Sequence, residues 1–227
     1  MVRYINLSPL VLNIQKSEIG NYYFTSDFHL NHKNILYYTD RNKYLSHRDN
    51  IDDSIKEMNN IIINNMNEIA DSNPNAILIN CGDIILGNHE EFWDYQSKLR
   101  FSKIINITGN HDLSNIFRDC TLEYSYDKNA KIQFSNTLYI KVCNGKHYLN
   151  TFMVSHIPVE SMSKLYNIHG HLHSPENLNE YFNNSDYDIA VRCKEDGRHH
   201  DCGLDRNNFK PISLEDIYLG KTDIKIN

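Results

Sequence analysis

Five short apolar runs in this 227-residue chain each end in residues with carboxylate, imidazole or amide side chains. A strand that runs into such residues presents them at its carboxyl end, where open α/β sheets place ligands. One Asp or His at a strand end is usually a cap or a solvated loop residue, but five such ends in one chain are hard to assign to chance. We therefore expect these strand ends to build one polar site. The runs end in Asp27-Phe28-His29, Cys81-Gly82-Asp83, Gly109-Asn110-His111-Asp112, His156, and His169-Gly170-His171-Leu172-His173.

Hydrophobic periodicity predicts alternating strands and helices in the first half of the chain. Between residues 51 and 69, apolar side chains recur at spacings of three and four, which predicts an amphipathic helix from about Asn50 to Asp71. A strand over 76–80, a second helix over 90–101 and a strand over 104–108 are expected to follow. The β-α-β-α-β order implies parallel strands joined by right-handed crossovers.

The character of the sequence changes after residue 120. Residues 121–155 hold short runs rich in Tyr, Ile and Phe, and Asn144-Gly145 is a strong hairpin signal between two of them. We expect these runs to be antiparallel strands of a second sheet that packs on the first. The polar stretch from 174 to 200 is either a solvated loop or a rim that helps to hold a phosphate ester.

Shorter elements are predicted elsewhere in the chain. Residues 1–20 alternate loosely between apolar and polar positions, which predicts an extra strand or hairpin before the core. Asn31 is a candidate N-cap of a short helix that extends through Tyr38. Ser213, with Asp216 three residues later, is a candidate N-cap of a terminal helix.

Charge and cysteine usage narrow the class of protein. The net charge of −6 and pI near 6.0 predict no strongly basic nucleic-acid surface, so an anionic substrate would be attracted locally, by metal ions. The five cysteines are scattered without a C-x-x-C pair, which favours reduced thiols over a disulfide framework or a zinc knuckle. The sequence shows neither a signal peptide nor an apolar run of about 20 residues, and we expect a cytoplasmic protein with no membrane partner.

The order of the polar motifs resembles that of the calcineurin-like metallophosphoesterase superfamily over residues 22–173. Three further segments, 24–27, 32–35 and 203–214, resemble a small phosphoesterase subgroup found in bacteria and their phages. The resemblance implies an α/β fold, a four-layer α-β-β-α sandwich of two packed mixed sheets flanked by helices. We expect one domain over 1–227, with a core from about 21 to 219 and an N-terminal extension over 1–20.

The same resemblance implies a dinuclear metal site. Asp83 would bridge the two ions. Asp27, His29 and His173 would complete the first metal site, and Asn110, His156 and His171 the second. Carboxylate, imidazole and amide donors without thiolate suit Mn²⁺, Fe or Zn²⁺. We expect Mn²⁺, with Fe, Zn²⁺, Ni²⁺ or Mg²⁺ as alternatives.

The expected chemistry is hydrolysis of a phosphoester. Two divalent ions polarise the phosphoryl oxygens and generate hydroxide from bound water near neutral pH. The resemblance assigns no metal to His111, which would protonate the leaving oxygen as general acid, while Asp112 fixes its tautomer. His32 and Arg198 are candidate substrate contacts. The alternatives are an exposed first-turn histidine and a solvated loop residue, respectively.

Two departures from relatives bear on the substrate. The Arg that follows Gly-Asp in the protein-phosphatase branch is replaced here by Ile84, which argues against a Ser/Thr phosphatase. Asn80 and Cys81 stand where the small subgroup commonly has His and Leu. We expect a phosphodiester in a small nucleotide or a nucleic-acid end as substrate. A phosphomonoesterase and a non-catalytic binding or scaffold protein on the same fold are the alternatives.

Overall fold

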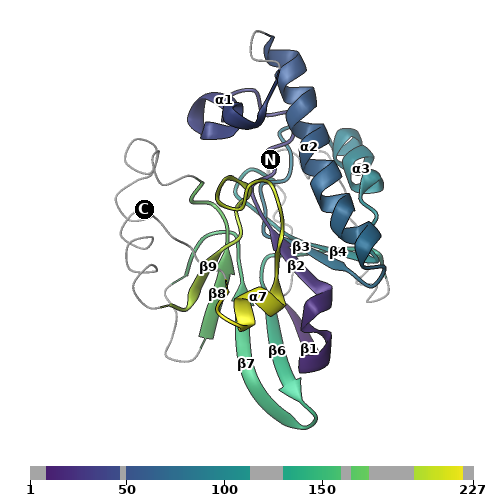
Figure 1. Ribbon diagram of the computed structural model, residues 1–227, viewed down its shortest axis with the longest axis vertical. Helices are drawn as coiled ribbons and strands as arrows, with labels where there is room; N and C mark the ends of the chain where they lie inside the picture. Colours follow the sequence, from purple (N-terminus) through teal and green to yellow (C-terminus); the bar gives the residue numbers. More distant parts are fainter. Residues whose placement is uncertain (1–8, 47–49, 113–129, 160–164, 174–196, 222–227) are drawn as a thin grey trace, which may run out of the picture.

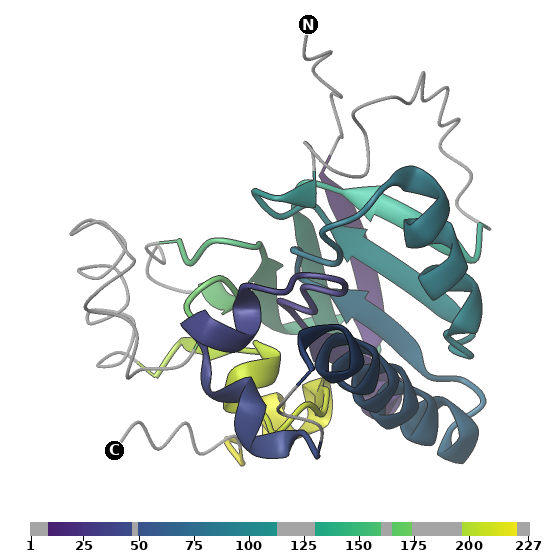
Figure 2. The same ribbon diagram turned by 90° about the horizontal axis from the view of Figure 1, so that it is seen from above.

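Two five-stranded mixed sheets pack face to face in the computed structural model, which describes residues 9–46, 50–112, 130–159, 165–173 and 197–221 (Figures 1 and 2). Both sheets contain parallel and antiparallel neighbours. The predicted α/β class with two packed mixed sheets and flanking helices is therefore confirmed.

The first sheet has the strand order β10-β2-β3-β4-β5. Its parallel strands are β2 (Tyr22–Thr25), β3 (Ile77–Asn80), β4 (Lys103–Ile107) and β5 (Ile132–Ser135), and β10 (Ile212–Ser213) is antiparallel to β2. The predicted parallel arrangement of β2, β3 and β4 is correct. The expectation that the strands in 121–155 all join the second sheet is wrong for β5, because it adds to the edge of β4 in parallel.

Two helices cover the outer face of the first sheet, where α2 (Ile51–Ser72) and α3 (His89–Lys98) lie side by side (Figures 1 and 2). The Asn50 side chain caps α2 by accepting the backbone N–H groups of Asp52 and Asp53. Two acidic residues in the first turn favour the positive end of the helix dipole. The middle of the predicted apolar stripe of α2 is buried, and Ile51 and Ile69 at its ends are partly buried. None of the described helices is both long enough and apolar enough to span a bilayer.

The short helix after the first motif begins later than predicted. Helix α1 covers Ile35–Tyr38 with Asn34 at its N-cap position, followed by the 3₁₀ helix η2 (Asp40–Tyr44). Asn31 is not the cap, because it adopts a left-handed backbone conformation with φ of 63°. Its side chain instead takes part in hydrogen bonds with Asn59, Glu91 and Tyr95, which anchor the loop to α2 and α3.

The second sheet has the strand order β1-β6-β7-β8-β9. Its strands are β1 (Leu10–Gln15), β6 (Leu138–Asn144), β7 (His147–Val154), β8 (Leu165–His169) and β9 (His199–Asp201). The predicted hairpin is confirmed, because β6 and β7 are antiparallel and meet at Asn144-Gly145. The N-terminal strand is also confirmed, and β1 pairs in parallel with β6. It continues into the 3₁₀ helix η1 (Lys16–Asn21).

The end of the predicted polar loop is a strand rather than a loop. His199 and His200 lie in β9, which pairs in parallel with β8, while residues 174–196 lie outside the described part of the chain. The chain then forms the 3₁₀ helix η4 (Leu204–Arg206) and helix α7 (Leu214–Tyr218). Ser213 accepts the backbone N–H of Asp216, as the capping pattern predicted.

Alternation along the strands divides the core into two layers. Leu78 and Ile104 face the helices, whereas their neighbours Ile79 and Ile105 face the second sheet. The two faces leave little freedom of register, because a shift by one residue would exchange them. Cys81, Cys143 and Cys202 are buried free thiols, and the other two cysteines lie outside the described residues.

Candidate metal centre

The loops that follow β2 and β3 run side by side at the carboxyl ends of these strands. The backbone N–H of Asp27 donates to the carbonyl of Gly82 at 2.9 Å, and the N–H of His29 donates to the carbonyl of Asp83 at 2.9 Å. This pairing extends the parallel ladder beyond the strands and brings the first two motifs together. The predicted ligands on these loops therefore become neighbours because their strands are neighbours.

Five of the predicted metal ligands have an unusual backbone conformation. Asp27, His29, Asp83, His171 and His173 have φ values of 58°, 47°, 55°, 73° and 49°. Such left-handed conformations are uncommon for residues other than glycine, and backbone strain of this kind concentrates at functional sites. The fold therefore uses backbone strain to turn these side chains toward one another.

Two glycines allow the loops to approach closely. A Cβ atom at Gly109 would collide with the side chain and backbone nitrogen of Asp83, and one at Gly170 would collide with Ser26 and the Asp27 carboxylate. These glycines are required because other backbone or side-chain atoms already occupy the space of a Cβ.

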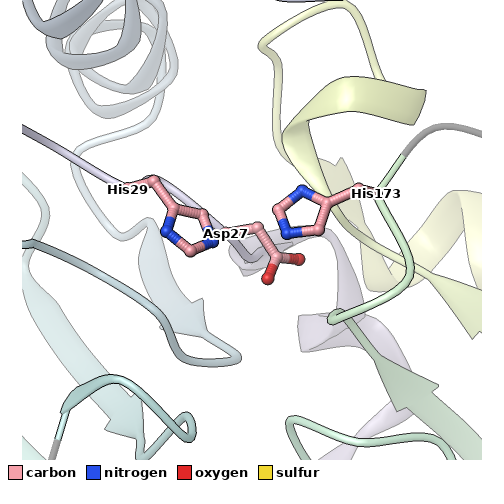
Figure 3. Close-up of side chains that lie close together, drawn as sticks. All are labelled: Asp27, His29 and His173. Carbon is pink, nitrogen blue, oxygen red and sulfur yellow. The ribbon is translucent and has the colours of Figure 1, made fainter. Parts of the chain in front are cut away.

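The first candidate metal-binding group consists of Asp27, His29 and His173, and the Asp27 carboxylate lies between the two rings (Figure 3). One ligand atom from each residue lies within 4.8 Å of the others. Asp27 Oδ1 and His29 Nε2 are buried and have no hydrogen-bond partner among the described residues. Unpartnered buried polar atoms are costly, and a bound cation would satisfy both.

The second candidate group consists of Asp27, Asp83 and His156, again with ligand atoms within 4.8 Å of one another. His156 Nδ1 lies 2.9 Å from the carbonyl oxygen of Cys81, so Nδ1 carries the proton in the neutral ring and Nε2 is left for a metal. Two more predicted ligands meet this nitrogen. Asn110 Oδ1 lies 2.8 Å from it, and His171 Nδ1 lies 3.2 Å from it.

Asp83 lies between His29 of the first group and His156 of the second. Its Oδ2 atom is 3.6 Å from His29 Nε2 and 3.4 Å from His156 Nε2, while its Oδ1 accepts the backbone N–H of His111 at 3.0 Å. This position fits the bridging role expected from the sequence. Asp27 is the carboxylate that belongs to both groups, and Asp83 lies beside it in the second group.

Burial and charge shift the acidities of these groups in the metal-free protein. Burial raises the pKa of Asp27 and lowers the pKa of His29 well below 6.5. Burial also disfavours the charged forms of Asp83 and His156, but their mutual attraction prevails. It lowers the pKa of Asp83 and raises the pKa of His156 to about 9. Buried carboxylates and imidazoles with strongly shifted pKa values, packed this closely, suit a site that holds cations.

His111 and His32 lie beside His29 at the edge of the ligand cluster. The His111 side chain is 46% exposed, and its Nε2 lies 3.9 Å from Asp83 Oδ2. Its ring centroid is 5.6 Å from that of His29, and the His32 centroid is 5.3 Å from His29 and 6.4 Å from His111. The structure therefore brings both predicted imidazoles to the edge of the ligand cluster, where a substrate could reach them.

Asp112 joins the loops after β3 and β4. Its Oδ2 accepts the backbone N–H groups of Asp83 at 2.9 Å and Gly109 at 2.7 Å, and its Oδ1 accepts the N–H of Ile84 at 2.9 Å. Burial, and then the charge of Asp83, raise the pKa of Asp112 to about 6. Through these contacts Asp112 holds the two loops together, and its expected role of orienting the His111 ring stays a prediction.

Arg198 lies at the wrong end of its strand to meet the other predicted residues. It precedes β9, and its carbonyl accepts the N–H of Asn167 in the middle of β8, whereas His171 and His173 follow the end of β8. Three residues of strand, about 10 Å, separate Arg198 from Asp201 at the carboxyl end of β9. The prediction that Arg198 contacts the substrate is therefore not supported by its position.

Three charged residues near the site were not singled out from the sequence. Arg41, Asp205 and Arg206 are buried close to the first group, and Asp205 Oδ2 lies 2.8 Å from His173 Nδ1. Asp205 and Arg206 fall in the tail segment 203–214 that carries the subgroup resemblance, so a signal for them existed. Arg41 lies in a polar stretch with no motif around it.

The donor set fits divalent metal ions. Oxygen and imidazole donors dominate both groups, which suits Mn²⁺, Fe or Zn²⁺ better than a soft metal. A comparison with protein families matches residues 20–214 to the calcineurin-like phosphoesterases. The chain belongs to this family. Its buried Asp and His groups could hold the metal ions of a calcineurin-like phosphoesterase.

This calcineurin-like phosphoesterase was also compared with curated proteins and with solved structures. No curated protein matches its sequence. Among solved structures, it is similar to the Pseudomonas putida nuclease MPE with 14% sequence identity and a TM-score of 0.39. The similarity covers 68% of this chain and 62% of the nuclease, which is less than two thirds of the nuclease's length.

Proposed function

We propose that this enzyme hydrolyses phosphodiesters, either small nucleotides or nucleic-acid ends, with two divalent ions held by the seven predicted ligands. The observation that supports a dinuclear site best is the position of Asp83. Its Oδ2 lies within 3.6 Å of His29 Nε2 and 3.4 Å of His156 Nε2, one imidazole from each proposed site. A carboxylate can bridge two cations, whereas a neutral imidazole cannot. We propose Mn²⁺ as the native metal.

The residues of the site have separate roles. When bound, the two ions supply Lewis acidity and hydroxide near neutral pH. The seven ligands hold them in place, and Asp112 keeps the loops of Asp83 and Gly109 in contact. His111 presents its exposed ring beside Asp83 and donates a proton to the leaving oxygen.

The charged residues near the first group favour a diester over a monoester. The two described arginines nearest the first group are buried and engaged, Arg41 with Asp205 and Arg206 with Asp201. Among the described residues, the imidazoles of His32 and His111 lie at the edge of the ligand cluster instead, with ring centroids 6.4 Å apart. A phosphomonoester carries up to two negative charges and gains more from fixed cations than a singly charged diester does. The net charge of −6 also favours small or terminal diesters over long duplexes.

A substrate panel with metal analysis tests this proposal. The panel compares bis- and mono-nitrophenyl phosphate, cyclic nucleotides, and short DNA and RNA, each with added Mn²⁺ and with a chelator. We expect about two ions per chain, turnover of the diesters above the monoester, and loss of both with the chelator. Preference for the monoester would overturn the diester assignment, and one ion per chain at full activity would overturn the dinuclear site.

A further inference from the structure

Arg41 is a fully buried arginine directly behind the first candidate group. It lies in η2, and its side chain is 0% exposed. Its Nη2 donates to the carbonyl of Asp27 at 2.5 Å, and its Nη1 donates to the carbonyl of Phe28 at 2.8 Å. The guanidinium thus holds the backbone of the loop that carries Asp27 and His29. Burying a charge this deeply is unfavourable unless it is paired and hydrogen-bonded.

The partner of Arg41 comes from the other end of the chain. Arg41 Nε donates to Asp205 Oδ1 at 2.8 Å, and Nη2 donates to Asp205 Oδ2 at 3.0 Å. This two-pronged geometry is the one that fixes a carboxylate in both position and orientation. The Asp205 side chain is 3% exposed, so its direction is set by these bonds rather than by solvent.

Asp205 in turn orients His173. Its Oδ2 lies 2.8 Å from His173 Nδ1, so this nitrogen carries a proton and Nε2 remains for a metal. The side chain of Arg206 holds the backbone of His173, because Arg206 Nε donates to the carbonyl of His173 at 2.7 Å. The tail segment around η4 therefore contacts the first group through both the ring and the main chain of His173.

We propose that Arg41 and Asp205 are positioning residues for the first metal site. Together they hold the Asp27 loop and the ring of His173 in the positions that the metal requires. The inference rests on the proposed role of His173 as a metal ligand. Partners of this kind set the tautomer and orientation of a ligand histidine, and their loss typically weakens metal binding about 10–100-fold. An ion pair that only fastened the tail to the core would leave metal affinity unchanged.

The experiment is titration of metal-free protein with Mn²⁺ by calorimetry, which resolves the affinity of each ion. Asp205→Asn weakens the contact with His173, and Asp205→Ala removes it. Arg41→Lys keeps the positive charge but loses the two-pronged hydrogen bonding to Asp205. We expect each Asp205 variant to weaken the binding of one ion about 10–100-fold and to leave the other within about threefold. Arg41→Lys also loosens the loop of the shared ligand Asp27, so it should weaken the first ion most and the second ion to a smaller extent. Asp205→Ala should lose the most affinity for the first ion, and Asp205→Asn and Arg41→Lys should lose less.

A matched control separates positioning from general loss of stability. Met66→Ala removes a fully buried side chain of α2 and should lower the melting temperature while leaving both affinities at the wild-type values. Nitrogen-15 NMR of the His173 ring in metal-free protein gives a second readout. The ring should carry its proton on Nδ1 in the wild type and be a mixture of tautomers in Asp205→Ala.

The outcomes also separate this inference from the proposed function. Unchanged affinities in the Asp205 and Arg41 variants, or an equal loss at both sites in proportion to melting temperature, would overturn the positioning role. If Asp205→Ala does not fold, Asp205→Asn and Arg41→Lys decide the same question. His173→Gln should lose the first ion. If it binds both ions normally, the ligand assignment of the proposed function fails, and the positioning role fails with it.

Discussion

The Nε2 atom of His156 lies 3.4 Å from the Oδ2 atom of Asp83, and both side chains are almost fully buried. Burial opposes the charge on His156, yet the hydrogen bond and charge of Asp83 raise its pKa from 6.5 to about 9. The same contact lowers the pKa of Asp83 against the effect of burial. Without metal, the two residues are therefore a buried ion pair at neutral pH.

This pair predicts how the stability of the metal-free protein depends on pH. A raised histidine pKa stabilises the fold fully below 6.5, and the contribution is lost as pH rises through about 9. We expect the free energy of unfolding to fall between pH 6.5 and 9.5, by up to about 3 kcal/mol from this pair. His173, whose pKa is raised by Asp205 against burial, changes stability in the same direction. Urea denaturation across this range measures the fall.

The matched variant for this prediction is Asp83→Asn. It removes the charge that raises the pKa of His156, so its stability should vary less with pH over the same range. Parallel pH profiles for the wild type and Asp83→Asn would show that the Asp83–His156 pair does not govern the pH dependence.

Metal ions should stabilise the fold. The donor groups are already gathered and partly unpartnered, so a cation that binds the native state raises stability by about 2.7 kcal/mol at 100 times its Kd. For a chain of this size, we expect a rise in melting temperature of about 5–10 °C with Mn²⁺ or Zn²⁺. Ca²⁺ should have a smaller effect, because it prefers oxygen ligands alone. Asp27→Asn, which alters the carboxylate shared by both groups, should lose most of the stabilisation. Equal shifts with Ca²⁺ would count against an imidazole-rich site.

His111→Gln should affect substrates according to their leaving groups. An alkoxide or ribose oxygen departs poorly without protonation, so loss of the general acid should lower kcat about 10²–10⁴-fold on an alkyl diester. A nitrophenolate is stable as an anion and should leave almost as fast as from the wild type. Metal content, determined on the same preparation, should be unchanged.

His147→Gln is the matched control for His111, since it alters an exposed imidazole at the start of β7 and should change neither rate. Equal losses on the alkyl and nitrophenyl esters by His111→Gln, at full metal occupancy, would show that His111 acts on the phosphoryl group itself.

Asp112→Ala should loosen the site by separating its loops. Three backbone N–H groups would lose their acceptor, and a buried donor without a partner costs about 1–3 kcal/mol. We expect a loss of about 3 kcal/mol or more in unfolding free energy together with weaker Mn²⁺ binding. Asp112→Asn keeps one oxygen acceptor and should lose less. Asp94→Ala breaks only an exposed pair with Lys98 and should cost less than about 1 kcal/mol. If urea denaturation finds Asp112→Ala no less stable than Asp94→Ala, Asp112 does not hold the loops.

Local interactions explain what could be predicted from the sequence. The apolar stripe of α2, the Asn144-Gly145 hairpin and the Ser213 cap all depend on residues a few positions apart. The strand ends with polar residues could also be recognised, because parallel strands bring their carboxyl ends to one edge. The family followed from the order of those ends, and the match over residues 20–214 confirms it.

Contacts between distant segments were decided only by the tertiary structure. Arg41 and Asp205 are 164 positions apart, and no local pattern pairs them. β5 joins the first sheet because β4 offers an open edge, which its own sequence does not reveal. Asn31 turns away from a helix start because Asn59 and Tyr95 offer it partners, and Asp112 finds three backbone amides on two loops. Residue types and spacing therefore determined the donors, whereas long-range packing decided which buried charges and amides hold them in place.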